Sequence, residues 1–123
     1  MTTRDKVIYI NSNKPSAHNE LVLNLDTRYG QHAFDLQLNC VLSLTGVTAI
    51  YGPSGSGKTT LLRSIAGLHS TGKGYIRFRQ VIWQDAMHYV PTHLRGLAYV
   101  SQNTNLFEYM SVQDNLNYAQ RRA

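Results

Sequence analysis

The chain has 123 residues, of which 42% are hydrophobic and 15% are charged. This is the composition of one globular domain or part of one, and it excludes a disordered tail. No apolar run approaches the ~20 residues that cross a bilayer, and a single cysteine excludes an internal disulfide and suits a reducing compartment. The net charge is +5, but the cations are scattered, without the basic stripe interleaved with aromatics typical of nucleic-acid-binding surfaces. We therefore expect no nucleic-acid partner.

The N-terminal part of the chain predicts a leader followed by a β-hairpin. Residues 1–20 have no assignable role and no visible secretory signal. Apolar and polar residues alternate over 21–26 and again over 34–39, which predicts two half-buried strands joined around Tyr29-Gly30. Residues 40–46 are expected to be a linker.

The middle of the chain changes period twice. Residues 47–51 form a short β-prone run without polar alternation, as expected of a strand buried on both faces of a parallel sheet. A glycine-rich loop over 52–57 interrupts it. From Lys58 the apolar residues recur at helical spacing, and Gly67 can end that helix.

The remainder predicts a second hairpin, a strand and a helix. A turn over 71–74 precedes strands at 75–79 and 81–83, and residues 97–100 read as a short apolar strand. Ser111 is expected to cap a final helix, with Asp114 three residues later completing an approximate capping box.

The run GPSGSGKT from Gly52 to Thr59 matches the phosphate-binding motif G-x-x-x-x-G-K-[ST] in full. Glycines let the backbone approach an anion closely, and the start of the following helix adds unpaired N–H groups and the positive end of its dipole. Lys58 supplies a mobile cation for the β- and γ-phosphates, the Thr59 hydroxyl is the expected ligand of Mg²⁺, and Thr60 can donate to the α-phosphate. The sequence therefore predicts an α/β fold containing part of a P-loop NTPase core, with an antiparallel β-hairpin subdomain on its N-terminal side.

Beyond the motif, GPSGSGKTTLLRSIAGL from Gly52 to Leu68 resembles the Walker A segment of ABC-transporter ATP-binding subunits. Tyr29 stands where that family has an aromatic residue that stacks on adenine. The segment YVSQ, ending at Gln102, resembles the family's Q-loop, whose glutamine contacts Mg²⁺ and the attacking water.

The resemblance implies a site for ATP and Mg²⁺. Lys58 and Gln102 would be the catalytic residues, and Thr59 and Gln102 the metal ligands. The implied nucleotide-binding residues are Tyr29, Gly52, Pro53, Ser54, Gly55, Ser56, Gly57, Lys58, Thr59 and Thr60.

Within the family the chain is most similar to molybdate-importer ATP-binding subunits, marked by Val81-Ile-Trp83 and by Pro91-Thr-His-Leu-Arg95. The resemblance implies coupling of Mg-ATP binding and hydrolysis to uptake of an oxyanion, here molybdate. Partners would be transmembrane permease subunits and a second ATP-binding subunit. The protein would lie in the cytoplasm, held at the inner face of the plasma membrane by the permease.

The family's signature segment, Walker B strand and switch histidine do not occur in these 123 residues. We therefore expect residues 21–123 to be the N-terminal part of a nucleotide-binding domain, truncated after the Q-loop, and expect this chain alone not to hydrolyse ATP. Two alternatives stay open: a non-catalytic nucleotide-binding protein that pairs with a full-length subunit, and a small P-loop kinase using Asp85 as its acid.

Overall fold

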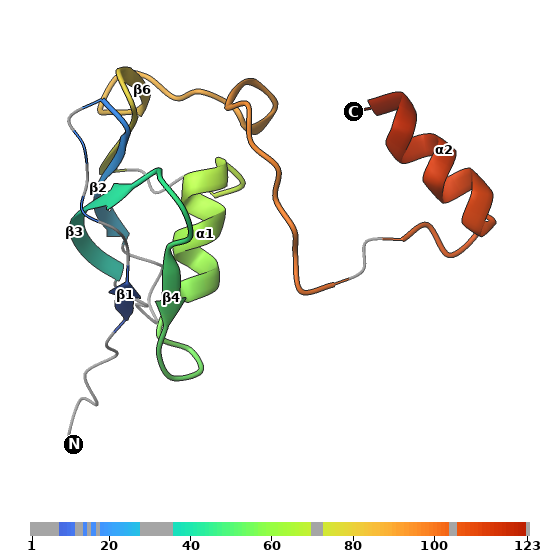
Figure 1. The fold of residues 1–123 in the computed structure, drawn as a ribbon, viewed down its shortest axis with the longest axis horizontal. Coiled ribbons are helices and arrows are strands. Elements are labelled where there is room, and N and C mark those ends of the chain that lie inside the picture. Colours follow the sequence, from blue (N-terminus) through green and yellow to red (C-terminus); the bar gives the residue numbers. More distant parts are fainter. Residues whose placement is uncertain are drawn as a thin grey trace.

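The computed structural model describes residues 8–11, 14, 16, 18–27, 36–69, 73–103 and 106–122. Its strands form a four-stranded antiparallel sheet of order β3-β2-β5-β6 and a two-stranded sheet of β1 and β4. Figure 1 shows helix α1 beside these sheets and helix α2 apart from them. The mixed α/β architecture expected from the sequence is confirmed.

The predicted hairpin forms one side of the larger sheet, with β3 at the edge and β2 inside. Strand β2 (Glu20–Thr27) pairs antiparallel with β3 (Leu36–Ser43), with Leu23 opposite Cys40. The expected linker beginning at residue 40 is wrong, because β3 continues to Ser43 and buries Leu42 and Ser43 at its end. The predicted connection at Tyr29 lies outside the described residues.

The second hairpin completes this sheet. Strand β5 (Lys73–Phe78) pairs with β2 on one side and with β6 (Val81–Gln84) on the other. The expected turn over 71–74 is wrong at its end, since Gly74 lies within β5 opposite Leu25. The rings of Phe78 and Trp83 stack with centroids 4.6 Å apart, which closes the core at this edge.

Strand β4 (Ala49–Tyr51) does not have the expected environment. It pairs antiparallel with β1 (Tyr9–Asn11), and Tyr51 is 56% exposed. Only Ile50 packs towards the core, while the Tyr51 ring stacks on that of Tyr9 at 5.2 Å. The prediction of a parallel strand buried on both faces is therefore wrong within the described residues, because β1 is the strand that pairs with β4 there.

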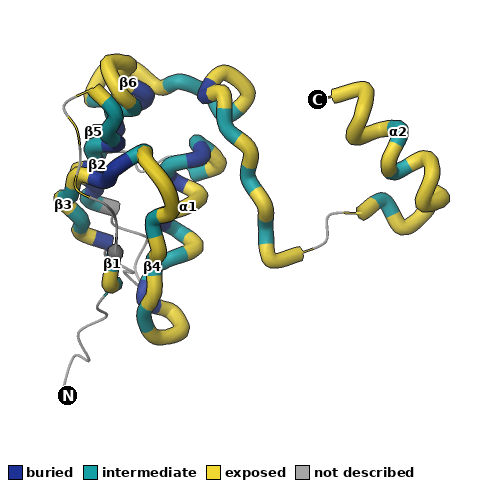
Figure 2. Tube along the Cα trace, in the orientation of Figure 1, coloured by how far each residue is buried: buried dark blue, intermediate teal, exposed yellow. Residues whose placement is uncertain are grey.

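Helix α1 (Lys58–Ala66) follows the glycine-rich loop as predicted. Leu61 is fully buried and belongs to the same apolar cluster as Leu23, Leu25 and Ile76 of the sheet. Figure 2 shows buried segments both on α1 and on the strands beside it. Gly67 ends the helix in the left-handed region, with φ of 73°, as predicted.

The C-terminal part differs from the rest in its packing. After the short 3₁₀ helix η1 (Thr92–Leu94), residues 97–100 form no strand, and Val100 is 93% exposed. The expected strand there is wrong, because none of the described strands hydrogen-bonds with it. Helix α2 (Val112–Arg122) buries none of its residues; its predicted cap is confirmed, since the Asp114 amide donates to Ser111 Oγ.

Among the described residues, neither helix has the length and apolar character required to span a membrane.

Candidate phosphate-binding site

The glycine-rich loop connects β4 to α1 and owes its shape to glycine backbones. Gly55 has φ of 75° and Gly57 has φ of 101°, conformations that side chains with a Cβ rarely adopt. A Cβ on Gly55 would meet nothing within 4 Å, so its glycine is required by backbone conformation rather than by space. These two residues turn the chain so that α1 begins at Lys58.

The N-terminus of α1 presents unpaired donors. The first helical hydrogen bond runs from the Leu61 amide to the Gly57 carbonyl at 2.8 Å, so the amides of Lys58, Thr59 and Thr60 precede the helical ladder. No side chain of the described residues caps this end, and its first turn holds no acidic residue. The positive end of the helix dipole is therefore not neutralised by a carboxylate of its own first turn.

Lys58 folds back over the loop. Its ammonium donates to the carbonyl oxygens of Gly52 and Pro53 at 2.8 and 2.7 Å, and to Ser56 Oγ at 3.4 Å. All three acceptors are uncharged, so these bonds orient the ammonium without cancelling its charge. Such bonds can be exchanged for bonds to a stronger, anionic acceptor.

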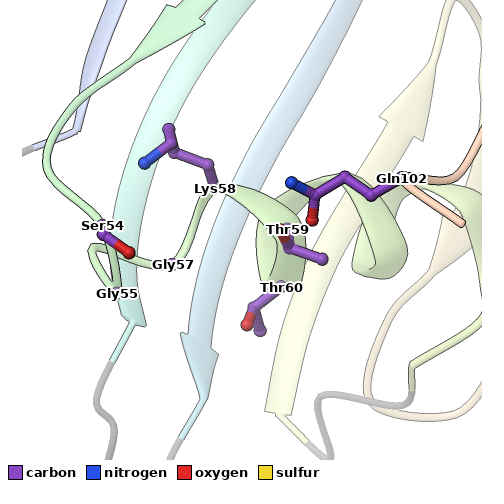
Figure 3. A pocket seen from close by; sticks show the side chains of 7 residues that line it. All are labelled: Ser54, Gly55, Gly57, Lys58, Thr59, Thr60 and Gln102. Carbon is purple, nitrogen blue, oxygen red and sulfur yellow. The ribbon is translucent and has the colours of Figure 1, made fainter.

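These groups surround a cavity of about 340 Å³ (Figure 3). Gln102, from the exposed segment after η1, reaches this cavity beside Thr59 and Lys58. The sequence predicted that Gln102 and the loop would share a site, and the fold brings them together. The lining residues are Ser54, Gly55, Gly57, Lys58, Thr59, Thr60 and Gln102.

The remaining predicted nucleotide-binding residues that the structure describes do not line the cavity. Gly52 and Pro53 hold the Lys58 ammonium through their carbonyls. Ser56 is buried, and its amide donates to Pro53 at 3.2 Å, which closes the turn of the loop. Tyr29 lies outside the described residues.

The donor set of the cavity fits the phosphate chain of a nucleotide. The described residues of its lining carry an ammonium, hydroxyls, an amide and backbone N–H groups, and no carboxylate. Its volume lies within the range of small-molecule sites, roughly 300–1,000 Å³. The Thr59 hydroxyl and the Gln102 carbonyl are oxygen donors of the kind that hard cations such as Mg²⁺ prefer.

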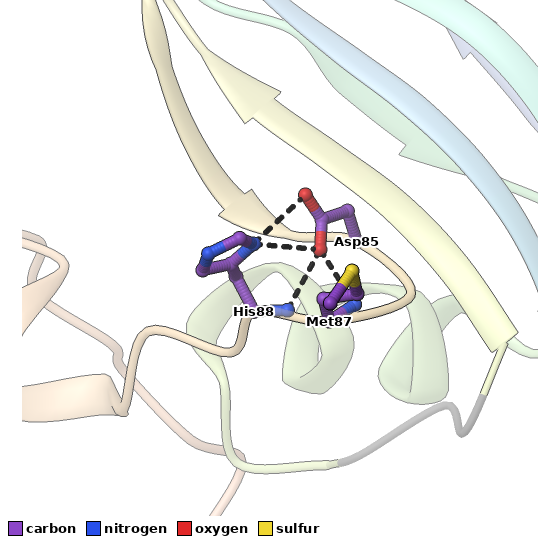
Figure 4. Close-up of polar contacts among 3 residues, drawn as sticks. All are labelled: Asp85, Met87 and His88. Atoms are coloured by element: carbon purple, nitrogen blue, oxygen red, sulfur yellow. Dashed lines mark hydrogen bonds and ion pairs between the residues drawn. The ribbon is translucent and has the colours of Figure 1, made fainter.

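Asp85, the acid of the kinase alternative, has a structural role in this fold. Its Oδ1 accepts hydrogen bonds from the amides of Met87 and His88, both at 2.7 Å, and contacts His88 Nδ1 at 3.1 Å (Figure 4). These bonds, that from the Met87 amide foremost, hold the pKa of Asp85 below its ordinary value. Asp85 does not line the phosphate-loop cavity, so the carboxylate shapes a turn.

The sequence predicted no role for Arg95, which stands within the Pro91–Arg95 segment that marks the family resemblance. Its side chain is only 3% exposed and bonds to the C-terminal end of α1. The acceptors lie about thirty residues earlier in the chain, and no local pattern reveals so distant a contact.

A glycine-rich loop between a strand and a helix, with Lys-Thr at the helix start, makes this fold a partial P-loop NTPase core. Residues 36–123 match the family described as ABC transporter. The chain belongs to that family.

Curated relatives carry the name "Molybdenum import ATP-binding protein ModC". The one from Thiobacillus denitrificans is 44% identical over 108 residues, covering 88% of this chain and 30% of the relative. The relative from Pseudomonas fluorescens is 46% identical over 102 residues, which cover 81% of this chain and 28% of the relative. The relative from Hahella chejuensis is 53% identical over 77 residues, which cover 63% of this chain and 22% of the relative. The chain therefore spans less than a third of the length of these relatives. No solved structure gives a significant match.

Proposed function

We propose that this chain supplies the phosphate-binding half of an ATP site in an ABC importer subunit. The observation that carries the proposal is the convergence of the open N-terminus of α1, the Lys58 ammonium, the Thr59 hydroxyl and Gln102 on one cavity. A triphosphate is the ligand that uses all of these groups at once, because it offers several anionic oxygens and a bound divalent cation.

Each residue has a distinct role in this proposal. The loop from Gly52 to Gly57 wraps the phosphates with backbone N–H groups, and Lys58 leaves its carbonyl acceptors to bind the β- and γ-phosphates. The Thr59 hydroxyl and the Gln102 carbonyl hold Mg²⁺, and Gln102 also orients the attacking water. Thr60 donates to the α-phosphate, and Tyr29 stacks on the adenine.

The transport function follows from the relatives rather than from the site. The name of these relatives refers to molybdenum import, and we propose uptake of an oxyanion, molybdate, for the protein that contains this chain. Residues 21–123 would be the N-terminal part of its nucleotide-binding domain, and residues 1–20 a leader of unknown role. Permease subunits and a second ATP-binding subunit would be its partners at the inner face of the plasma membrane.

Calorimetry tests the ATP site directly. We expect saturable heat when Mg-ATP is titrated into the folded chain. Lys58→Ala should weaken binding by about tenfold or more, since a hydrogen bond to a charged group is worth roughly 1.5–3 kcal/mol. Arg63→Ala, an exposed cation on the same helix, is the matched control and should bind like the wild type. Absence of any heat from the folded chain at millimolar Mg-ATP would contradict the proposal.

Hydrolysis is a separate measurement. Phosphoryl transfer depends on groups that position the water and stabilise the developing charge, and these 123 residues contain only part of the family's set. We expect phosphate release from this chain to equal that of its Lys58→Ala variant. Release above that control would show that the present residues suffice for turnover.

A further inference from the structure

Arg95 is a buried cation bound to neutral groups. Its Nη1 donates to the carbonyl oxygens of Ser64 and Ile65 at 3.0 and 2.7 Å, and its Nε donates to that of Val90 at 2.7 Å. Its guanidinium lies over the rings of Trp83 and Tyr89, with centroid distances of 5.5 and 5.1 Å. No carboxylate within the described part of the chain pairs with this cation. Its burial is therefore costly, and desolvation lowers the pKa of Arg95.

The acceptors of Arg95 are at the C-terminal end of α1. The last carbonyls of a helix have no helical donors and carry its negative partial charge. Arg95 donates to the carbonyl of Ile65 and adds a second donor to that of Ser64, which also accepts from the Gly67 amide at 3.1 Å. The Tyr89 hydroxyl donates to the Gly67 carbonyl just beyond, at 2.6 Å. The helix whose N-terminus forms the phosphate site is therefore fastened at its other end to residues 89–95.

Gly67 leaves the room that this contact requires. A Cβ at Gly67 would lie 2.7 Å from Arg95 Nε and 2.8 Å from its Cζ. A glycine at position 67 thus allows both the left-handed conformation that ends α1 and the close approach of the Arg95 guanidinium.

Arg95 also stands where the segment carrying Gln102 begins. Its amide donates to Thr92 at 3.1 Å in η1, and Gly96, with φ of 58°, redirects the chain immediately afterwards. Leu97 is partly buried against the core, but the segment then continues without pairing to any described strand. The position of Gln102 beside Thr59 therefore depends on how firmly the start of this segment is held.

We propose that Arg95 is a positioning residue for the nucleotide site, which fixes the segment bearing Gln102 relative to the helix bearing Thr59. It acts through Gln102 and touches no nucleotide. The inference rests on the proposed function for its effect on Mg-ATP, but its geometric part can be measured without nucleotide.

The geometric test measures the distance between two spin labels in a Cys40→Ser background. One label is attached at Leu62→Cys on α1 and the other at Asn103→Cys, next to Gln102. Both positions are exposed. We expect a narrow distance distribution in the parent, a broad one in Arg95→Met, and an intermediate one in Arg95→Lys, which keeps the charge but loses the two-nitrogen geometry. Arg63→Met removes a cation from the last turn of the same helix and should leave the distribution narrow. An unchanged narrow distribution in Arg95→Met would overturn the proposal.

The functional test compares ATP affinity with Mg²⁺ and with chelator. In the parent chain, Mg²⁺ should raise the affinity for ATP. Arg95→Met should reduce this gain in affinity by about tenfold, because the loss of a group that orients metal ligands commonly has an effect of this size. The affinity for ATP without Mg²⁺ should change little. Adding Gln102→Ala to Arg95→Met should cause no further loss of Mg²⁺-dependent ATP affinity, because the two substitutions remove the same contact of Gln102 with the metal. Equal losses with and without Mg²⁺ would instead indicate a merely structural role and overturn the proposal.

The two proposals fail in different ways. A folded chain that binds no ATP refutes the nucleotide site but leaves the distance measurement valid. If Arg95→Met does not fold, Arg95→Lys carries both tests. If Arg95→Lys is also unfolded, Arg95 is a requirement of folding rather than a positioning residue, and the proposal is wrong.

Discussion

Gly55 and Gly57 give the phosphate loop its turn, because each adopts a positive φ. The same conformation occurs at Gly46, with φ of 76°, in the exposed stretch before β4. The three positions therefore share a backbone requirement but differ in their distance from the cavity, since Gly55 and Gly57 line it. Comparing an alanine at Gly57 with one at Gly46 therefore separates the loss of folding stability from the effect on ATP binding.

Gly57→Ala is expected to lower the free energy of unfolding by about 1–2 kcal/mol, the usual cost of placing an L residue in the left-handed region. It should also weaken Mg-ATP binding, because relief of that strain would move the first amides of α1. Chemical denaturation and calorimetry measure the two effects. Gly46→Ala is the control, expected to lower stability by a similar amount while leaving ATP affinity unchanged. Equal ATP affinities in Gly57→Ala and the wild type would contradict the role given to this glycine.

The Asp85 turn has a pH dependence with a definite sign. Since its pKa is lower in the folded chain, the carboxylate stabilises the fold above the unfolded pKa of about 3.9, and this contribution is lost as pH falls through the folded value. An NMR titration should place the Asp85 midpoint below about 3.9. Asp85→Asn keeps an oxygen acceptor for the turn and should remove this part of the acid dependence. A midpoint at or above the unfolded value would refute the assigned hydrogen bonds.

At the scale of elements, α1 joins the site to the core. Its N-terminus lines the candidate phosphate-binding cavity, its Leu61 side chain enters the apolar cluster of the sheet, and its C-terminus accepts hydrogen bonds from Arg95. Packing of this helix therefore fixes the direction in which the loop amides point.

Leu61→Ala is expected to destabilise the chain by about 2–5 kcal/mol, because it leaves a cavity between α1 and the sheet. Leu62, the next residue, is 44% exposed, so Leu62→Ala is the matched control and should change stability by no more than ~0.5 kcal/mol. Urea denaturation measures both. Similar losses in the two variants would show that α1 does not pack by the face described.

Local sequence signals predicted the elements better than their partners. Alternation identified β2, and the glycine-rich motif located the loop and the start of α1, because these signals reside within a few residues. β4 was misjudged because an apolar run indicates a strand but not its neighbour, and its partner β1 lies about forty residues away. The strand expected over 97–100 failed for the same reason: its composition suits a strand, yet no described strand pairs with it.

Local signals in the sequence also pointed to the residues that line the candidate cavity. The motif from Gly52 to Thr59 supplied five of the seven lining residues, Thr60 follows it directly, and the resemblance supplied Gln102. Arg95 escaped prediction because its acceptors are backbone carbonyls, which have no sequence signature. Long-range contacts of this kind follow from the fold and can be identified only from it.

On the scale of the whole molecule, the chain divides into a packed part and an exposed C-terminal part. Among the described residues, all the buried ones lie between Leu21 and Arg95. Contacts of α2 are made with the turn just before it: Asn115 Nδ2 donates to the Phe107 carbonyl at 3.2 Å, and the Phe107 ring meets Tyr118 edge-on at 4.9 Å. Figure 1 shows this unit apart from the sheets.

A chain ending at Asn103 should therefore retain the stability and the phosphate site of the full 123 residues. Hydrophobic stabilisation scales with the apolar area removed from water, and α2 buries none of its residues, so its removal withdraws little from the core. We expect the two chains to unfold with free energies equal to within about 0.5 kcal/mol and to bind Mg-ATP alike, since Gln102 is kept. Chemical denaturation of both chains measures the free energy of unfolding, and calorimetry measures the affinity for Mg-ATP. Leu61→Ala is the reference variant for a loss of core packing. A fall in stability comparable to that of Leu61→Ala would mean that α2 packs against the body in solution, and the division into two parts would be wrong.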